Sequence, residues 1–297
     1  MSKDAVACQV EVSRKWELFL ERAEPLLLKH EAESNLFWEV GRVLARSTEP
    51  DQSWRGWVVS ESGEPILAGL PSVTGYLILS TGEIRACPVL AAYLSQQGIR
   101  LHGVSGPDPV SDSFATSWAE MSEGEVRQVG KLSCYLIDVS MELPTNVEGW
   151  FRKADAQEGE LVREWAIDFA AESPHPMEPR QSSQLGERML GENDLYVWEE
   201  NQEVVAMGGF GRETPNGLII NLVYVPRNRR GRGFAGALTL GLVREALERG
   251  KEFCCLYSDF RSSVRRNLYE RIGFRMVGEF TERAFGVQSD NAPSERQ

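Results

Sequence analysis

VYVPRNRRGRGFAG, residues 223–236, places four arginines and three glycines between an apolar run and an apolar helix-like segment. The surrounding chain is acidic, with 44 Asp and Glu against 32 Lys and Arg among 297 residues and a formal net charge of -12 at pH 7. This acid excess argues against a general affinity for nucleic acid. A basic, glycine-rich loop in such a chain needs a local explanation.

Two interpretations of the loop conflict with its context. Arginine–glycine segments that bind nucleic acid are repeated and disordered, whereas this one occurs once, between structured elements. Residues 231–236 also match G-x-G-x-x-G, with Asp259 downstream where a dinucleotide fold holds the ribose. However, polar residues 226–230 separate the expected strand from Gly231, and too little chain follows Asp259 to complete that sheet.

A third interpretation, a site for a bulky phosphorylated cofactor, fits the context. The loop joins an expected strand at 217–225 to an expected helix at 233–249. The start of a helix offers N–H groups without partners and a partial positive charge. Glycines let the backbone approach a diphosphate, and arginines supply charge for a further phosphate. The pattern therefore favours an anion site at the start of this helix.

The helix at 233–249 is amphipathic and carries its own stop signal. Arg244–Glu248 and Glu245–Arg249 are expected to pair on its outer face, and Gly250 is placed as a C-terminal cap. The positions expected to face inward are Ala235, Leu238, Leu242, Val243, Ala246 and Leu247.

The remaining pattern alternates helices and strands in a similar order in two halves, which predicts a mixed α/β protein with a duplicated topology. A polar linker at 140–149 separates the halves, and the tail 288–297 is expected to be disordered. The first half has helical spacing over 16–44, strands at 54–60, 65–70, 75–80, 100–106 and 131–139, and helices at 86–98 and 111–121, the latter capped by Ser111 or Asp112. The second half has strands at 150–154, 194–200, 203–211, 217–225, 252–258 and 274–280, and helices at 157–172, 183–190, 233–249 and 262–273.

Cysteine and histidine usage narrows the class of protein further. Five scattered cysteines show no metal-binding spacing and no disulfide framework, which indicates reduced thiols in a cytoplasmic compartment. With only three histidines, a multi-histidine metal site is not expected. MSKDAVACQV lacks the apolar run of a signal peptide, and no later segment is long and apolar enough to span a bilayer.

The loop resembles the cofactor motif of the GNAT superfamily of acyl-CoA N-acyltransferases. The superfamily pattern Q/R-x-x-G-x-G/A falls on residues 228–233, with Asn228 departing at the first position, and LYERIGF at 268–274 resembles the superfamily's final helix and strand. HEAESNLFW at 30–38 and the total length resemble a subgroup with two GNAT-like halves, of which the first has lost the cofactor motif. The resemblance implies a tandem GNAT-like fold, with a degenerate domain at 1–140, an acetyltransferase domain at 146–285 and a tail at 286–297.

The resemblance also implies a reaction and a set of residues. Acetyl-CoA would be the co-substrate, with no metal, and its acyl group would pass to a primary amine of a small molecule or peptide by direct attack in a ternary complex. Tyr269 is the candidate general acid for the leaving thiolate. The residues implied in binding the cofactor are Leu222, Val223, Tyr224, Val225, Arg230, Gly231, Arg232, Gly233, Phe234, Ala235 and Ser262.

Several roles stay open at this stage. The expected strand before the loop offers Asn221 rather than a carboxylate, so the general base is sought among Glu172, Asp259 and His175, or in a water chain. A non-catalytic acyl-CoA sensor is the alternative function. An acyl-cysteine route through Cys254 or Cys255 is a minor alternative. Trp54, Trp57 and Trp118 either belong to the core or line the acceptor pocket. A homodimer is left open, and neither nucleic acid nor a membrane is expected as a partner.

Overall fold

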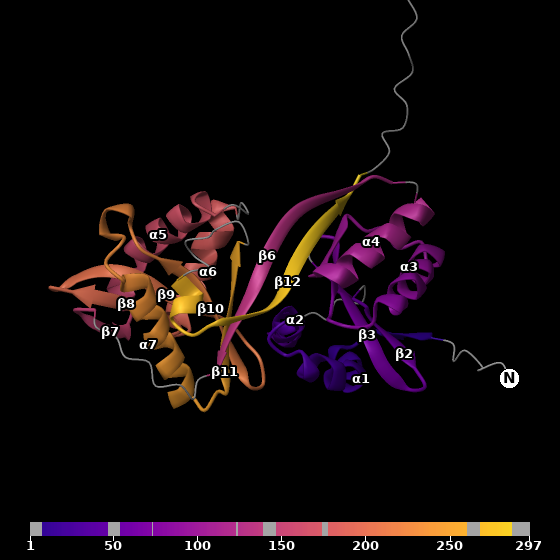
Figure 1. Cartoon of the computed structure of the whole chain (residues 1–297), viewed down its shortest axis with the longest axis horizontal. Helices are drawn as coiled ribbons and strands as arrows, with labels where there is room; N and C mark the ends of the chain where they lie inside the picture. Colours follow the sequence, from indigo (N-terminus) through magenta and orange to yellow (C-terminus); the bar gives the residue numbers. More distant parts are fainter. Residues whose placement is uncertain are drawn as a thin grey trace, which may run out of the picture. The chain divides into compact units, whose positions relative to one another are not determined.

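The structure is a computed structural model that describes residues 8–46, 54–72, 74–122, 124–138, 147–173, 178–259 and 268–286. The chain forms two compact units: unit 1 comprises Met1–Lys131 and Gly278–Gln297, and unit 2 comprises Leu132–Val277 (Figure 1). Most of the expected linker, residues 140–146, and the whole expected tail, residues 288–297, lie outside the described residues. The division at 1–140, 146–285 and 286–297 therefore stays a prediction.

Unit 1 is built on a sheet ordered β1-β2-β3-β4-β5-β12. Its strands are antiparallel except for the parallel pair β4 and β5. The strands are β1 (Gln9–Ser13), β2 (Gly56–Glu61), β3 (Glu64–Pro71), β4 (Tyr76–Leu79), β5 (Gly103–Pro107) and β12 (Arg275–Phe285). The helices are α1 (Trp16–Lys29), α2 (Asn35–Arg46), the short η1 (Ile84–Ala86), α3 (Cys87–Gln96) and α4 (Asp108–Ser122).

The core of unit 1 follows from alternation along its strands. On β2, Trp57 and Val59 face a cluster that includes residues of α3 and α4, whereas Val58 faces a cluster that includes residues of α1 and α2. Because both faces are covered, the strands read as nearly continuous apolar runs. Trp54, Trp57 and Trp118 are all buried in these two clusters, as expected for core residues.

Unit 2 repeats the same arrangement in the order β7-β8-β9-β10-β11-β6, with β10 and β11 as its parallel pair. Figure 1 shows α5 and α6 on one side of this sheet and α7 on the other. The repeat confirms the duplicated α/β topology. The strands are β6 (Val126–Asp138), β7 (Trp150–Lys153), β8 (Leu195–Glu200), β9 (Glu203–Glu213), β10 (Gly217–Tyr224) and β11 (Phe253–Asp259). The helices are the short η2 (Ala156–Glu158), α5 (Gly159–Ala171), α6 (Pro179–Gly191), the short η3 (Arg227–Arg229) and α7 (Phe234–Glu248).

The last strand of each sheet comes from the half of the sequence that was expected to form the other sheet. β12, near the C-terminus, pairs with β5 from Phe280 opposite Pro107 to Ala284 opposite Gly103. β6, which precedes the expected linker, pairs with the whole of β11 through its residues Leu132–Asp138. The sequence assigned the strand at 131–139 to the first half and the strand at 274–280 to the second. The apolar pattern predicts that a strand exists but carries no information on which sheet receives it.

Three local expectations were wrong and one is confirmed. β1 was not expected. α4 begins at Asp108 rather than after a cap at Ser111 or Asp112, and Ser111 Oγ donates to the Asp108 carbonyl, 3.2 Å away. Leu247 is 53% exposed and does not face inward. Gly250 does end α7: its φ is 75° and its N–H donates to the Leu247 carbonyl, 2.9 Å away.

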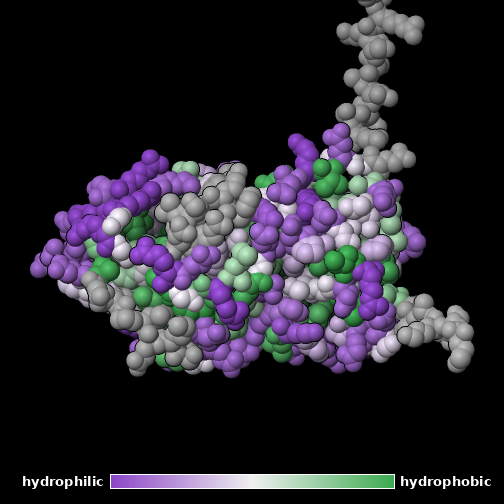
Figure 2. Space-filling view, in the orientation of Figure 1, coloured by the Kyte–Doolittle hydropathy of each residue, from purple (hydrophilic) through white to green (hydrophobic). Residues whose placement is uncertain are grey.

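The visible surface is mainly hydrophilic, with hydrophobic residues in small groups (Figure 2). Within the described part of the chain, no helix is long and apolar enough to cross a membrane.

Candidate functional site

The parallel strands β10 and β11 part before either of them ends. Their paired positions run from Gly217 opposite Phe253 to Ile220 opposite Leu256. β10 then continues to Tyr224 and β11 to Asp259. Beyond Ile220, the described residues of β11 no longer pair with β10. An unpaired strand edge can accept an extended ligand as an added strand.

A bulge in β10 marks the point of parting. Leu222 has a φ of 53°, and the pairing of β10 with β9 shifts register between Asn221 and Tyr224. The Leu222 N–H donates to Asn221 Oδ1, 2.7 Å away. The bulge switches the even-numbered side chains of β10 from one face of the sheet to the other. Ile220 packs on the α7 side, whereas Leu222 and Tyr224 pack on the α5–α6 side. Asn221 thus stabilises the bulge.

The glycine loop connects the end of β10 to α7 with two left-handed residues. Gly231 has a φ of 82° and Gly233 a φ of 88°, and α7 begins directly afterwards at Phe234. A Cβ at Gly231 would meet nothing within 4 Å, so the backbone there borders open space. Left-handed residues beside a helix start turn backbone N–H groups toward a common point, which suits a phosphate.

The four arginines of the loop are all held by carboxylates of unit 2. Glu172 accepts from Arg227 Nε at 3.0 Å and from Arg230 Nη2 at 2.7 Å. Arg232 Nη2 lies 2.6 Å from Glu200 Oε1, and Arg229 pairs with Glu203. Burial alone would raise the pKa of Glu172, but the hydrogen bonds from Arg230 and Arg227 outweigh it and lower the pKa below its ordinary value of 4.5.

Arg230 is fixed more firmly than its neighbours. Its Nε donates to the Val225 carbonyl at 2.8 Å, and its guanidinium lies 5.7 Å from the centre of the Tyr224 ring. The Tyr224 hydroxyl bonds to Asp168 Oδ2 at 3.2 Å, which links the loop to α5. Burial and the neighbouring Asp168 charge raise the pKa of Tyr224 to about 12, so this phenol stays protonated.

Tyr269 lies on the α7 side of the sheet. It is 8% exposed and belongs to one buried cluster with Val225 and Phe234, against which Val223 and Ala235 also pack. Its ring centre lies 6.2 Å from that of Tyr135 on β6. The structure therefore brings the candidate catalytic tyrosine together with four of the implied cofactor-binding residues. Leu222 and Tyr224 lie on the opposite face.

The other sequence candidates fare differently. Ser262 and His175 lie outside the described residues. Asp259 is buried at the end of β11, beyond the point where the strands part. Cys254 lies in the core, where burial raises the pKa of its thiol to about 12, so it is a poor nucleophile. Among the described residues no group of three or more His, Cys, Asp or Glu side chains is arranged to hold a metal ion.

Sequence reasoning missed the carboxylates that hold the loop. Glu200 and Glu203 flank the β8–β9 turn and precede the arginines by about thirty residues in the chain. Only the acidic composition hinted at such partners. Their pairing could not be deduced from spacing, because it depends on how the β8–β9 hairpin lies beside β10.

Among the described residues of unit 1, the ends of β4 and β5 do not part as those of β10 and β11 do. A Cβ at Gly106 of β5 would lie 3.0 Å from the Leu79 carbonyl oxygen, so β4 and β5 stay in contact at their ends. In the loop that follows β4, a Cβ at Gly82 would lie 2.3 Å from the Ile66 carbonyl oxygen.

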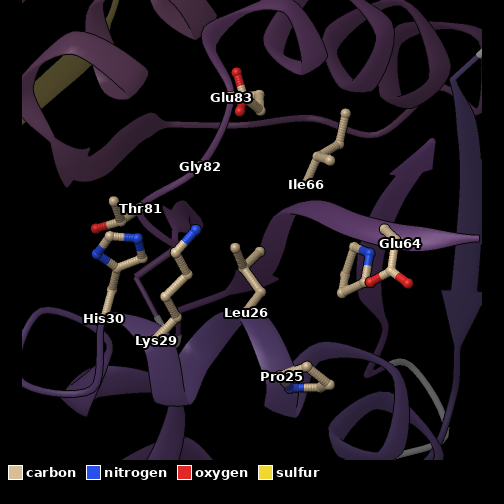
Figure 3. A pocket seen from close by; sticks show the side chains of 10 residues that line it. Pro25, Leu26, Lys29, His30, Glu64, Ile66, Thr81, Gly82 and Glu83 are labelled. Atoms are coloured by element: carbon tan, nitrogen blue, oxygen red, sulfur yellow. The ribbon is translucent and has the colours of Figure 1, made fainter.

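Unit 1 has instead a cleft of about 360 Å³ between the end of α1, the start of β3 and the loop after β4. Figure 3 shows the Lys29 side chain reaching between His30 and Leu26, with Glu64 and Glu83 at the margins. His30 Nδ1 lies 3.4 Å from Glu33 Oε2. The lining mixes both charges with apolar groups, so it does not single out a class of ligand.

Comparison with known proteins agrees with this geometry. Residues 160–274 match the model of the acetyltransferase (GNAT) family. No curated protein matches the sequence. A solved GCN5-related N-acetyltransferase from Sphaerobacter thermophilus is 17% identical, with a TM-score of 0.61 over 96% of this chain and 98% of that one. A GNAT-family acetyltransferase from Colwellia psychrerythraea is 13% identical, with a TM-score of 0.57 over 93% and 99% of the two chains.

A third similar structure is a tandem GNAT protein from the clavulanic acid biosynthesis pathway. It is 13% identical, with a TM-score of 0.53 over 95% of this chain and 100% of that one. At such identities the likeness shows the fold. The fold is that of a tandem GNAT-like protein, and residues 160–274 of this chain match the model of the GNAT acetyltransferase family. Family and fold support acyl-CoA-dependent acetyl transfer in general terms.

Proposed function

We propose that unit 2 transfers an acetyl group from acetyl-CoA to a primary amine of a small molecule or of an exposed peptide. The amine attacks the thioester carbonyl directly while both substrates are bound, the C–S bond breaks, and CoA leaves as the thiolate. No metal takes part in this proposal. Phe234 and Ala235 at the start of α7, with Gly231 to Gly233, would hold the diphosphate through backbone N–H groups.

One observation carries the proposal. The part of β10 that no longer pairs with β11 leads directly to two left-handed glycines at the start of α7. An extended arm bonded to Val223 and Val225 would end at a diphosphate site within a few residues. A nicotinamide dinucleotide has no comparable extended amide chain, so this continuity favours CoA.

Tyr269 would stabilise the departing thiolate. A phenol has an ordinary pKa near 10 and a thiol one near 8.5, so complete proton transfer to the thiolate costs about 2 kcal/mol. Donation of a hydrogen bond to the developing charge carries no such cost. The role proposed for Tyr269 is therefore a hydrogen-bond donor, with the proton of the attacking amine balancing the overall reaction.

The amine must lose a proton, and the candidates for the base differ in suitability. Glu172 is held by two arginines with a lowered pKa, which makes it a weak base. Asp259 is buried on the β11 segment beyond the parting and faces away from Tyr269 by strand alternation. Asp259, Glu172 and His175 therefore all stay candidates for the base.

The setting proposed for this reaction is a reducing cytoplasm. All five cysteines carry free thiols, and four of them are buried. An acidic chain suits a cationic amine as the acceptor.

A non-catalytic acyl-CoA sensor is the second candidate. It is favoured by Asn221, whose side chain serves the Leu222 N–H where a carboxylate base could otherwise stand. The enzyme and the sensor would bind acyl-CoA at the same site, and only the enzyme would transfer the acyl group.

The test is calorimetric titration of the purified chain with acetyl-CoA, CoA and NADH, followed by chromatography of free CoA released in the presence of a panel of amines. Binding of both CoA species without NADH, together with amine-dependent CoA release, supports the enzyme. Binding without release for every amine supports the sensor. Absence of CoA binding overturns both.

A further inference from the structure

Two opposite charges border the cleft of unit 1 without pairing with each other. α1 ends at Lys29 and β3 begins at Glu64, and both residues line the cleft of about 360 Å³. Both are exposed, so a ligand from solvent can reach them. Within the described part of the chain, neither side chain forms an ion pair or a hydrogen bond. One cation and one carboxylate are therefore available at the same opening.

The repeated topology shows that this corner of the fold differs between the two units. The end of α1, the start of β3 and the loop after β4 correspond to the end of α5, the start of β9 and the loop after β10. In unit 2 these places carry Glu172, Glu203 and the loop arginines, which join in ion pairs. In unit 1 the charges are exchanged: the helix end carries Lys29 and the loop carries Glu83. The corner that ion pairs bridge in unit 2 is thus not bridged by Lys29 and Glu64 in unit 1.

Apolar side chains line the cleft between these two charges. In Figure 3, Lys29 lies on one side of Leu26 and Glu64 on the other, and Ile66 lies above them. Pro65 adds a further apolar surface beside Glu64. The mixture of groups does not define a ligand, but their separate positions narrow the choice to a molecule with an apolar body and a charge of opposite sign at each end.

The remaining charged groups of the lining already have partners. His30 Nδ1 lies 3.4 Å from Glu33 Oε2, so the second ring nitrogen of His30, Nε2, is the one available to a ligand beside Lys29. The Glu83 carboxylate lies 3.9 Å from Arg85 Nε. The basic side of the cleft is therefore the end of α1, and its free acidic group is Glu64.

We infer that this cleft binds a short apolar peptide, with the terminal carboxylate at Lys29 and the terminal ammonium at Glu64. The side chains of the peptide would cover Leu26 and Ile66. A dipeptide carries its two charges at opposite ends, with at most about 7 Å of extended chain between them. A ligand with a single charge would leave either Lys29 or Glu64 without a partner. The inference goes beyond the proposed function and does not rest on it, because every residue of the cleft belongs to unit 1.

The experiment measures the binding of three probes to the full chain by saturation-transfer NMR. Leucyl-leucine carries both charges, N-acetyl-leucyl-leucine lacks the ammonium, and leucyl-leucinamide lacks the carboxylate. Wild type should bind leucyl-leucine about three- to tenfold more tightly than either of the other probes, the effect of one partly exposed charge contact. Equal affinity for all three probes, or no binding of leucyl-leucine, would overturn the inference.

Two variants test which end of the peptide meets which side chain. Glu64→Gln should abolish the preference for leucyl-leucine over its N-acetyl form and keep the preference over the amide. Lys29→Met should do the reverse, because it removes the partner of the carboxylate. Both residues are exposed, so both variants should unfold at nearly the wild-type temperature. Preferences that survive in both variants, or that are lost in the opposite order, would overturn the inference.

Lys15→Met is the matched control for Lys29→Met. Lys15 is also exposed but precedes the first turn of α1, about 21 Å from Lys29 at 1.5 Å per helical residue. The control should bind all three probes as wild type does. An equal loss of leucyl-leucine binding in Lys15→Met and Lys29→Met would show that the net charge of the chain sets the affinity, and this result would also overturn the inference.

Discussion

Glu172 Oε2 lies 2.7 Å from Arg230 Nη2, and this ion pair joins the end of α5 to the glycine loop. The other carboxylate oxygen of Glu172 accepts from Arg227. The free chain thus supplies its own anion to arginines that a bound phosphate would compete for. Glu172 both orders the loop and opposes the charge of the proposed cofactor, and these two effects can be separated by experiment.

Replacing Glu172 with Gln should tighten the binding of CoA while loosening the free loop. The substitution removes a negative charge beside Arg227 and Arg230, so the affinity for CoA should rise roughly two- to fivefold, the effect of a partly exposed charge pair. The gain should shrink in high salt because of screening. Calorimetry at two ionic strengths checks this.

The matched control for this prediction is Glu203→Gln, which releases only Arg229. Its effect on CoA affinity should be smaller, because one arginine is freed instead of two. Weaker binding by Glu172→Gln would mean that ordering of the loop outweighs the charge, and would contradict the prediction.

The same pair predicts a dependence of stability on pH. The pKa of Glu172 is lowered in the folded chain, so its contribution is present above the ordinary value of 4.5 and is lost as the pH falls through the lowered value. Wild type should therefore exceed Glu172→Gln in urea midpoint at pH 6, and the gap should close as the pH falls below 4.5 and through the lowered pKa. A gap that persists at low pH would show that the stabilisation does not come from the ionised carboxylate.

Gly231 offers the cleanest probe of the anion site. Gly231→Asp adds a negative charge at a position where a Cβ meets nothing, and it should weaken CoA binding about tenfold or more. Gly231→Asn has nearly the same shape, and both residues tolerate a positive φ, so the two variants should be similarly stable. Calorimetry should find that Gly231→Asn binds CoA with nearly the affinity of wild type and that Gly231→Asp binds it weakly.

Gly250→Asp serves as the control for a residue with a side chain and a negative charge at a positive φ away from the proposed anion site. Gly250 also has a positive φ and open space around its Cβ position, but it lies past the far end of α7. The Gly250→Asp variant should bind CoA with the same affinity as wild type. Equal weakening by Asp and Asn at position 231 would instead indicate a loss of loop geometry rather than charge repulsion.

The sequence predicted the site's backbone better than its side chains. A strand end, a loop and a helix start are local features, so the pattern predicted the connection from β10 to α7, whereas the positive φ of Gly231 and Gly233 came from the structure. The positive φ of Leu222 had no such signal, because nothing in GLIINLVYV distinguishes a bulged strand from a regular one.

Long-range pairing limited the fold prediction in the same way. Helix and strand periods placed the elements, but the exchange of β6 and β12 between the sheets depends on contacts between residues far apart in the chain, as with Phe280 and Pro107. Leu247 was misjudged for a smaller reason. Leu247 lies at the margin of the buried face of α7, where a small rotation about the helix axis decides whether the side chain is buried or exposed.

Replacing Tyr269 with Phe should lower the turnover rate and leave CoA affinity unchanged. The phenyl ring keeps the contacts with Tyr135 and Phe274, and only the hydroxyl is lost. We expect kcat to fall roughly a hundredfold. Tyr135→Phe is the control, because it removes a hydroxyl from the neighbouring buried ring. Similar losses of kcat in both variants, or a parallel loss of affinity, would indicate that Tyr269 serves packing alone.

Arg283 should be essential to unit 1 although it lies near the end of the chain. Its side chain is 9% exposed, and its guanidinium bonds Ser111 Oγ at 2.7 Å and Asp108 Oδ1 at 3.1 Å, so it ties β12 to the start of α4. Arg283→Met should lower the free energy of unfolding by about 1.5–3 kcal/mol, because it breaks hydrogen bonds between charged groups and leaves Asp108 underpaired. Arg275→Met on the same strand is the control: Arg275 is 62% exposed and only 3.9 Å from Asp138, so its loss should stay within about 0.5 kcal/mol. Urea unfolding followed by tryptophan fluorescence measures both variants, and equal effects would mean that β12 is held by its backbone pairing alone.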